Sequence, residues 1–267
     1  MKVIKQSPSL QLKNIVHQIE VFENDDGLKT KTQELIHFAN GLPGIYFQIS
    51  EHPVKLRFFG KCHLLPKAFI YGQNLYPKVS IIPPYSKVIL FYLHPTTLSY
   101  FKNITPENLV DQYLDLENQH PFNYSILFKL LKSEDSTTAQ VQTLTDYLID
   151  LVDQPKVHFI SESKSLRMLD SKSPINLSIQ GAKRTVQRFF KEHIGITPTK
   201  YYQVLQFNSA LKKLLLADNK PLVSIAHETE YADQSHFIRQ FKTFTATTPK
   251  EFLRQSHPYI SLINPLK

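Results

Sequence analysis

A chain of 267 residues is long enough for one large domain or two ordinary ones. Its 42% hydrophobic and 20% charged content is typical of a folded soluble protein and excludes a disordered tail. No run of about 18 apolar residues is present, so no transmembrane helix is expected, and the N-terminus lacks the apolar segment of a signal peptide. With Cys62 as the single cysteine, an internal disulfide and a cysteine-based zinc site are excluded. Together these features predict a cytoplasmic protein.

The net charge of +8 is unevenly distributed along the chain. Residues 1–155 contain 14 Lys/Arg against 15 Asp/Glu, whereas residues 156–267 contain 17 Lys/Arg against 8 Asp/Glu. The whole basic excess therefore lies in the C-terminal part. Such an asymmetry indicates a polyanionic partner for one domain, either nucleic acid or an anionic membrane surface. A basic domain that is merely soluble is the alternative on charge alone.

The first 100 residues are predicted to be rich in β-strands. Short apolar stretches alternate with Gly and Pro turn signals, a spacing typical of a sandwich or a small barrel, with a cupin-like barrel as one option. The predicted strands are Ile45–Ile49, Lys55–Phe59, Ala68–Tyr71, Val79–Ile82 and Val88–Leu93.

The pattern changes to helical from Thr105 onward. Thr105-Pro106 has the cap-then-proline start of a helix, for which Leu109, Tyr113, Leu114 and Leu116 would form the buried stripe. Two further helices are predicted over Asn123–Leu131 and Ala139–Val152. We therefore divide the chain into a β-rich sensor or dimerisation domain with trailing helices (1–132), a connecting helix (133–155) and an all-α domain (156–258).

The all-α domain is predicted to contain short and long helices in alternation. Apolar residues at helical spacing place Val186, Phe190 and Ile194 on one buried face, with Gly195 as a left-handed cap. The predicted helices are Val157–Leu169, a short one opened by Ser173-Pro174, Lys183–Ile194, one from Thr197-Pro198 to Leu216, Pro221–Thr229, Ser235–Phe244 and one from Thr248-Pro249 to Ser256. The inward residues of the long helix would be Val204, Phe207, Leu211 and Leu215, and those of the next long one Phe237, Phe241 and Phe244.

One unit occurs twice in this domain. In the first copy a short helix, the turn Gln180-Gly181-Ala182 and a longer amphipathic helix precede Thr197-Pro198. In the second copy a short helix, a turn around Glu230-Tyr231-Ala232 and a longer helix precede Thr248-Pro249. A short helix, a tight turn and a longer helix are the parts of a helix-turn-helix, whose second helix lies in the major groove of DNA.

The C-terminal stretch IAHETEYADQSHFIRQFKTFTATTPKEF resembles the signature of the AraC/XylS family of transcriptional regulators, and AKRTVQRFFKEHIGITPTKYYQVLQFNSALKKLL resembles the preceding part of that domain. The resemblance covers roughly residues 156–256, and FIYGQN with its downstream strands more loosely resembles the sensor-type domain of one branch. It implies a regulator that binds an operator or promoter in double-stranded DNA, with RNA polymerase, a small-molecule effector at the N-terminal domain and a second copy of the chain as further partners. Three positions depart from the family pattern: Glu230 and Thr245 stand at usual glycines, and Asn176 at a usual alanine. If the backbone needs a positive φ at the two lost glycines, each would cost about 1 kcal/mol.

Residues on the outward faces of the two reading helices are the predicted DNA contacts. Arg and Gln suit guanine and adenine edges, whereas Lys more often neutralises phosphate. A linker helix of about 27 Å plus its turns would hold the two helices roughly one DNA turn apart, about 34 Å, so that one monomer could enter two successive major grooves. The alternative role for Arg188 and Arg239 is a salt bridge to an adjacent helix, and for His236 the capping of a turn. The predicted contacts are Lys183, Arg184, Gln187, Arg188, Lys191, Gln234, Ser235, His236, Arg239 and Lys242.

No catalytic, cofactor or metal site is predicted. His37, His52, His63 and His94 are too scattered for the HxH pattern of a cupin metal site, and no nucleophile motif or phosphate-binding loop occurs. The aromatic residues of the N-terminal half could line a ligand cavity, although a packed core is favoured: Tyr46, Phe47, Phe58, Phe59, Phe69, Tyr71, Phe91 and Tyr92. The competing functional hypothesis is a small-molecule-binding protein whose helical half is a protein-interaction module, and the location of the basic charge favours DNA over it.

Overall fold

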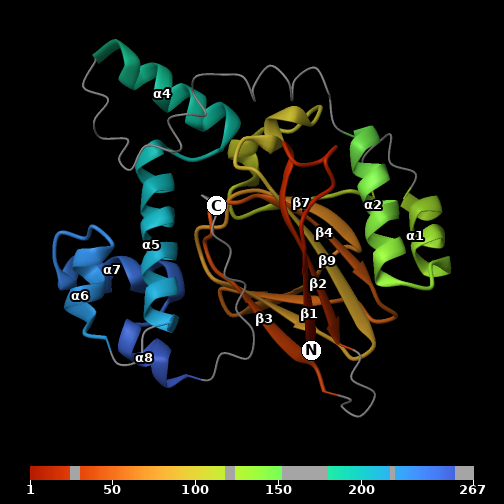
Figure 1. Cartoon of the computed structure of the whole chain (residues 1–267), viewed down its shortest axis with the longest axis horizontal. Helices are drawn as coiled ribbons and strands as arrows, with labels where there is room; N and C mark the ends of the chain where they lie inside the picture. Colours follow the sequence, from red (N-terminus) through yellow and green to blue (C-terminus); the bar gives the residue numbers. More distant parts are fainter. Residues whose placement is uncertain (25–30, 118–123, 152–179, 217–219, 256–267) are drawn as a thin grey trace.

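The computed structural model describes residues 1–24, 31–117, 124–151, 180–216 and 220–255, with side chains described from residue 184 onward in the fourth range. Two β-sheets form the N-terminal half, and helices form the rest (Figure 1). The predicted fold class, a β-rich part followed by an all-α part, is confirmed. The predicted helices over Val157–Leu169 and after Ser173-Pro174 lie outside the described residues. None of the described helices is long and apolar enough to cross a membrane.

The first sheet has six antiparallel strands. Their order is β1–β2–β9–β4–β7–β10, and their bounds are β1 Lys2–Gln6, β2 Val16–Asn24, β9 Ser86–Leu93, β4 Gly44–Ile49, β7 Ala68–Tyr71 and β10 Tyr113–Asp115.

The second sheet has four antiparallel strands. Their order is β3–β8–β5–β6, and their bounds are β3 Gln33–His37, β8 Lys78–Ile82, β5 Lys55–Phe58 and β6 Lys61–Leu64. One buried cluster contains Tyr46 and Leu90 of the first sheet together with Leu35 and Ile82 of the second. The two sheets therefore face each other as a sandwich, one of the two arrangements that the strand spacing predicts.

All five predicted strands exist, and five others escaped prediction. β1, β2, β3, β6 and β10 carry interspersed charged or amide residues, such as Glu20 in β2, that hide the apolar alternation. Glu20 is nevertheless buried, and Lys5 of the neighbouring strand β1 lies 2.9 Å from its carboxylate.

The predicted helix from Thr105 is wrong beyond its first turn. Pro106–Leu109 forms only a short 3-10 helix, η2, which follows a second one, η1 (Thr97–Tyr100). Asp111 then adopts a left-handed φ of 57°, and β10 pairs with β7. The predicted start at Thr105-Pro106 is therefore correct. The apolar residues that follow pair with β7 as a strand, although their spacing also fits the buried face of a helix.

Helices α1 (Tyr124–Ser133) and α2 (Thr137–Leu151) cover the outer face of the first sheet (Figure 1). Both lie close to their predicted ranges. Val141, Leu144 and Leu148 of α2 are buried in the same cluster as Ile45 and Phe47 of β4. The connecting helix thus packs onto the N-terminal half.

The C-terminal helices lie on the opposite side of the sheets from α1 and α2 (Figure 1). They are α4 (Gln180–His193), α5 (Pro198–Leu216), α6 (Leu222–Glu228), α7 (Gln234–Thr245) and α8 (Pro249–Arg254). Their main core cluster also takes in Phe38, whose ring lies 6.3 Å from that of Phe207 and 5.7 Å from that of Phe252. The helical half is therefore packed directly onto the N-terminal half.

Two details of the predicted helices are wrong. α4 begins at Gln180, so the residues predicted as a turn before it lie within its first turn. In α5, Leu214 is buried and Leu215 is 36% exposed, the reverse of the predicted orientation. Only the last residue of the buried face of α5 differs from the prediction: Leu214, and not Leu215, packs in the core with Phe207.

Candidate nucleic-acid interface

The segment from α6 to α7 forms a short helix, a tight turn and a longer helix. The carboxylate of Asp233 caps α7 by accepting a hydrogen bond from the backbone N–H of His236 at 2.7 Å. Tyr231 anchors the turn, since its side chain is buried and its ring lies 5.3 Å from that of Phe237. The turn therefore fixes the start of α7 against the core.

The apolar face of α7 decides which side chains point outward. Phe237, Phe241 and Phe244 are completely buried, as the helical spacing predicts. The ring of His236 is half-buried at 5.3 Å from that of Tyr231. The exposed predicted contacts on this helix are Gln234, Ser235, Arg239 and Lys242.

α4 is built in the same way. Val186, Phe190 and Ile194 are buried, and Gly195 ends the helix with a φ of 93°, so the predicted left-handed cap is confirmed. The exposed predicted contacts are Arg184, Gln187, Arg188 and Lys191, while the side chain of Lys183 lies outside the described part.

The two candidate reading helices both pack on α5: α4 lies at its start, and α7 lies beside its middle (Figure 1). α5 contains 19 residues, which corresponds to about 28 Å of helix. Phe190 of α4 contacts Tyr201 near the start of α5, with ring centroids 5.8 Å apart, and Phe241 of α7 contacts Phe207 at 5.6 Å. Packed aromatic contacts thus hold α4 at the start of α5 and α7 at its middle.

The basic side chains on these faces differ in their partners. Arg188 pairs with Glu192 on its own helix at 3.9 Å, and both side chains remain largely exposed. Lys191 lies 3.0 Å from Glu107 of η2, in the N-terminal half. Within the described residues no ion pair holds Arg184 or Arg239. A salt bridge to an adjacent helix, the alternative for both Arg188 and Arg239, is thus absent from the described contacts.

The two glycine replacements have different consequences. Glu230 has a φ of 62°, so its position does require the left-handed conformation, and its carboxylate accepts a hydrogen bond from the hydroxyl of Tyr202 at 2.6 Å. Thr245 is still helical, and the left-handed residue that closes α7 is Ala246, with a φ of 64°. The predicted strain therefore exists after α7, but one residue later.

Replacing Ala246 by glycine is expected to stabilise the protein by about 1 kcal/mol, because alanine is strained at this positive φ and glycine is not. Urea unfolding measures the change. Ala232→Gly is the control, since Ala232 is exposed in the α6–α7 turn and is not among the residues with positive φ. An Ala246→Gly variant no more stable than the parent would contradict the strain at this position.

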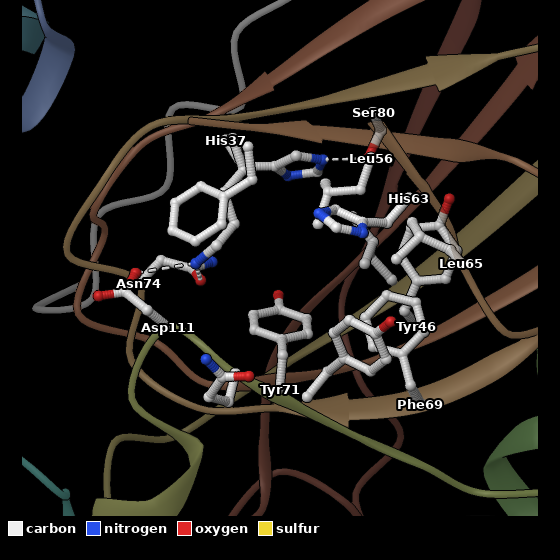
Figure 2. A pocket seen from close by; sticks show the side chains of 15 residues that line it. His37, Tyr46, Leu56, His63, Leu65, Phe69, Tyr71, Asn74, Ser80 and Asp111 are labelled. Atoms are coloured by element: carbon white, nitrogen blue, oxygen red, sulfur yellow. Dashed lines mark hydrogen bonds and ion pairs between the residues drawn. The ribbon is translucent and has the colours of Figure 1, made fainter. Parts of the chain in front are cut away.

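A second feature is a cavity of about 310 Å³ between the two sheets (Figure 2). Its apolar wall is aromatic and aliphatic, with Tyr46, Leu56, Phe58, Phe69 and Leu90 among its residues. The aromatic residues of the N-terminal half thus divide: Tyr46, Phe58, Phe69 and Tyr71 line the cavity, Phe47, Phe91 and Tyr92 belong to packed core clusters, and Phe59 is 71% exposed.

The polar wall of the cavity contains an ion pair. The ammonium of Lys78 lies 2.8 Å from a carboxylate oxygen of Asp111 and donates to Asn74 as well. His37, on β3, lies 2.8 Å from the Ser80 hydroxyl, and burial together with the charge of Lys78 lowers the pKa of His37 to about 4. His37 is therefore neutral at physiological pH.

Sequence reasoning missed these polar residues because they lie on separate strands and loops. Of the four histidines considered in the sequence, His37 and His63 line the cavity. His94 does not line it, and a nitrogen of its ring lies 3.0 Å from the carbonyl oxygen of Lys13. Over the described residues no group of three or more His, Cys, Asp or Glu is placed to hold a metal ion.

Comparisons with known proteins match the C-terminal helices. Residues 181–255 match a family model described as a helix-turn-helix domain. The HTH-type transcriptional activator RhaS of Pectobacterium carotovorum is 33% identical over 73 residues, which are 27% of this chain and 26% of the relative. The HTH-type transcriptional regulator ArgR of Pseudomonas aeruginosa is 27% identical over 70 residues, 26% of this chain and 21% of the relative. The chain thus spans about a quarter of the length of these curated relatives.

Among solved structures, ToxT from Vibrio cholerae aligns over 95% of this chain and 98% of its own, with 10% identity and a TM-score of 0.43.

Proposed function

We propose that the chain, whose residues 181–255 match a helix-turn-helix domain, is a transcription regulator of the AraC/XylS type that binds double-stranded DNA. In this proposal α4 and α7 enter two successive major grooves on one side of the duplex. The observation that carries it is the pair of exposed, partly basic faces on α4 and α7, two helices that are both held on α5 by packed aromatic rings. The proposal requires that these two faces reach major grooves roughly one DNA turn, about 34 Å, apart.

The roles follow from side-chain chemistry. Arg184 and Arg239, which make no ion pair within the described part, are assigned to guanine edges, and Gln187 and Gln234 to adenine edges. Lys191 and Lys242 are assigned to phosphates, and the basic excess of the C-terminal part supplies sequence-independent attraction to the duplex. Such a regulator would work in the cytoplasm, with RNA polymerase and a second copy of the chain as further proposed partners.

The N-terminal half is assigned the role of an effector domain, running to the end of α2. A cavity of about 310 Å³ with a mostly apolar wall and a few convergent polar groups is the usual form of a small-molecule site. Packing of Phe38 and Leu75 against the helical core would transmit its occupancy to the DNA-binding half.

The test is a selection of bound fragments from a random duplex library with the full-length protein. We expect a motif with two blocks about one helical turn apart. Arg184→Ala should relax one block and Arg239→Ala the other, each by about 1–3 kcal/mol of base discrimination. Lys129→Ala, which removes a positive charge from an exposed position on α1, is the control and should leave the motif unchanged. Binding that depends on salt alone and enriches no motif would refute sequence-specific recognition.

A further inference from the structure

Three segments of the N-terminal half are each shared between the cavity and the helical half. In each of them one residue lines the cavity and its neighbour in sequence packs against a helical core cluster. The pairs are His37 with Phe38, Asn74 with Leu75, and Asp111 with Val110. A change in the polar wall of the cavity therefore acts directly on the contact between the two halves.

Asp111 holds two of these segments together. Its carboxylate accepts hydrogen bonds from the backbone N–H of Leu75 at 2.9 Å and of Tyr76 at 3.4 Å, besides pairing with Lys78. Its own N–H donates to the carbonyl of Gln73 at 2.9 Å. Asp111 keeps a left-handed φ of 57° in this position, a conformation that aspartate adopts when its short side chain forms hydrogen bonds to nearby backbone groups such as these. The loop therefore has a relaxed alternative once the bonds of the carboxylate are weakened.

Lys78 is the charged group of the cavity that a ligand could take over. Its side chain is only 8% exposed, and its ammonium lies 4.7 Å from the centroid of the Phe58 ring. Burial lowers the pKa of Lys78 and the carboxylate of Asp111 opposes that effect, so a second anion within reach would also keep the lysine charged.

An anion is favoured over a cation by what each would leave behind. An anion that displaced Asp111 from Lys78 would leave a carboxylate whose side chain is already 14% exposed, so it can turn toward water and let go of the backbone N–H groups of Leu75 and Tyr76. A cation that displaced Lys78 from Asp111 would leave a buried ammonium without a counter-charge, which is the costlier state.

We propose that the cavity binds a small molecule with one anionic group and an apolar body, and that this group replaces Asp111 as the partner of Lys78. Asp111 then no longer holds the backbone of Leu75. Leu75 and Val110, which both pack against the helical half, become free to move. The effect on DNA rests on the proposed function, whereas the release itself does not.

Release of the turn at Asp111 is expected to favour DNA binding, because Asp111 follows η2 closely in the chain and η2 contacts α4. Glu107 of η2 pairs with Lys191 of α4 at 3.0 Å, and a Cβ on Gly195 would lie 2.6 Å from the Pro106 carbonyl oxygen. The N-terminal half thus occupies a lysine assigned to phosphate and lies tightly against the end of α4. Loosening η2 frees both.

The coupling is tested in the full-length protein with Asp111→Asn, Lys78→Met and the double variant. Each single variant should speed hydrogen exchange of the backbone amides over residues 194–205 and tighten binding to a fixed duplex about fivefold or more. The double variant should do no more than the stronger single one, because one ion pair is removed in all three. Lys2→Met, which breaks the Lys2–Glu23 pair between β1 and β2, is the control and should change neither readout. Additive effects, or unchanged exchange, would overturn the coupling.

Asp111→Asn removes the charge but keeps the size of the side chain, and Lys78→Met retains the length of the side chain, so both are expected to fold; melting curves check this. Faster exchange without any binding to duplexes would leave the coupling standing and refute the DNA function instead.

The ligand class is tested with benzoate, phenylacetate and cinnamate against their neutral amides. At least one carboxylate should raise the melting temperature of the parent protein while its amide does not, and Lys78→Met should abolish the difference. Amides that match the carboxylates, a Lys78→Met variant that still discriminates, or no response to any carboxylate would overturn the anionic assignment.

Discussion

Replacing Gly195 by alanine is expected to destabilise the contact between the two halves by about 2–4 kcal/mol. Gly195 has a φ of 93°, and a Cβ at this position would lie 2.6 Å from the backbone carbonyl oxygen of Pro106. The strained φ costs about 1 kcal/mol, and forcing the backbone of η2 away from α4 adds a term typical of overpacking, about 1–3 kcal/mol. Urea unfolding and hydrogen exchange at residues 194–205 measure the loss.

Gly60 provides a matched control for this variant. It has a φ of 74°, but a Cβ there would meet no atom within 4 Å. Gly60→Ala should therefore show the backbone term alone, about 1 kcal/mol, with no change in exchange over residues 194–205. Equal losses in the two variants would mean that the approach of Pro106 to Gly195 contributes nothing.

Replacing Phe38 by alanine is expected to cost about 3–5 kcal/mol, as for other large-to-small changes in a core. Phe38 is 6% exposed and belongs to the N-terminal half, yet its ring packs on those of Phe207 and Phe252 in the helical half. The cavity that remains would weaken the contact between the halves as well as the core. Thermal unfolding followed by near-ultraviolet circular dichroism should show a lower melting temperature and a broader transition.

Phe59→Ala is the comparison, because Phe59 is a phenylalanine of the same half that is 71% exposed. Its loss should stay within about 0.5 kcal/mol. A small effect of Phe38→Ala, close to that of Phe59→Ala, would show that the halves do not depend on this contact.

The helix-turn-helix region follows from the sequence because its information is local. Phe237, Phe241 and Phe244 recur at helical spacing, Gly195 closes α4, and Thr248-Pro249 opens α8 with a capping box. Exposed Arg184 and Arg239 follow from the same spacing once the buried faces are known. The one-residue shifts at Leu214 and Ala246 arose because packing against neighbouring helices sets the last turn of a helix.

The N-terminal half was less predictable because its pairing is between distant residues. The sequence predicts a helix over β10 because Leu114 and Leu116 fit either period, and only pairing with β7 decides between helix and strand. The sequence does not predict β2 because charged and amide residues interrupt its apolar ones, and the buried Glu20 is paired with Lys5 of the adjacent strand only in the folded sheet.

Composition alone locates the basic charge, and residues a few positions apart are enough to predict the two classes of secondary structure and the outward faces of α4 and α7. Only the tertiary structure decided which aromatic residues line a cavity, and only it brought Lys78, Asp111 and His37 together. It also decided that Glu107 meets Lys191 and that Phe38 enters the helical core. The physical reason is that strand pairing and the contact between halves join residues far apart in the chain, where no periodicity records their proximity.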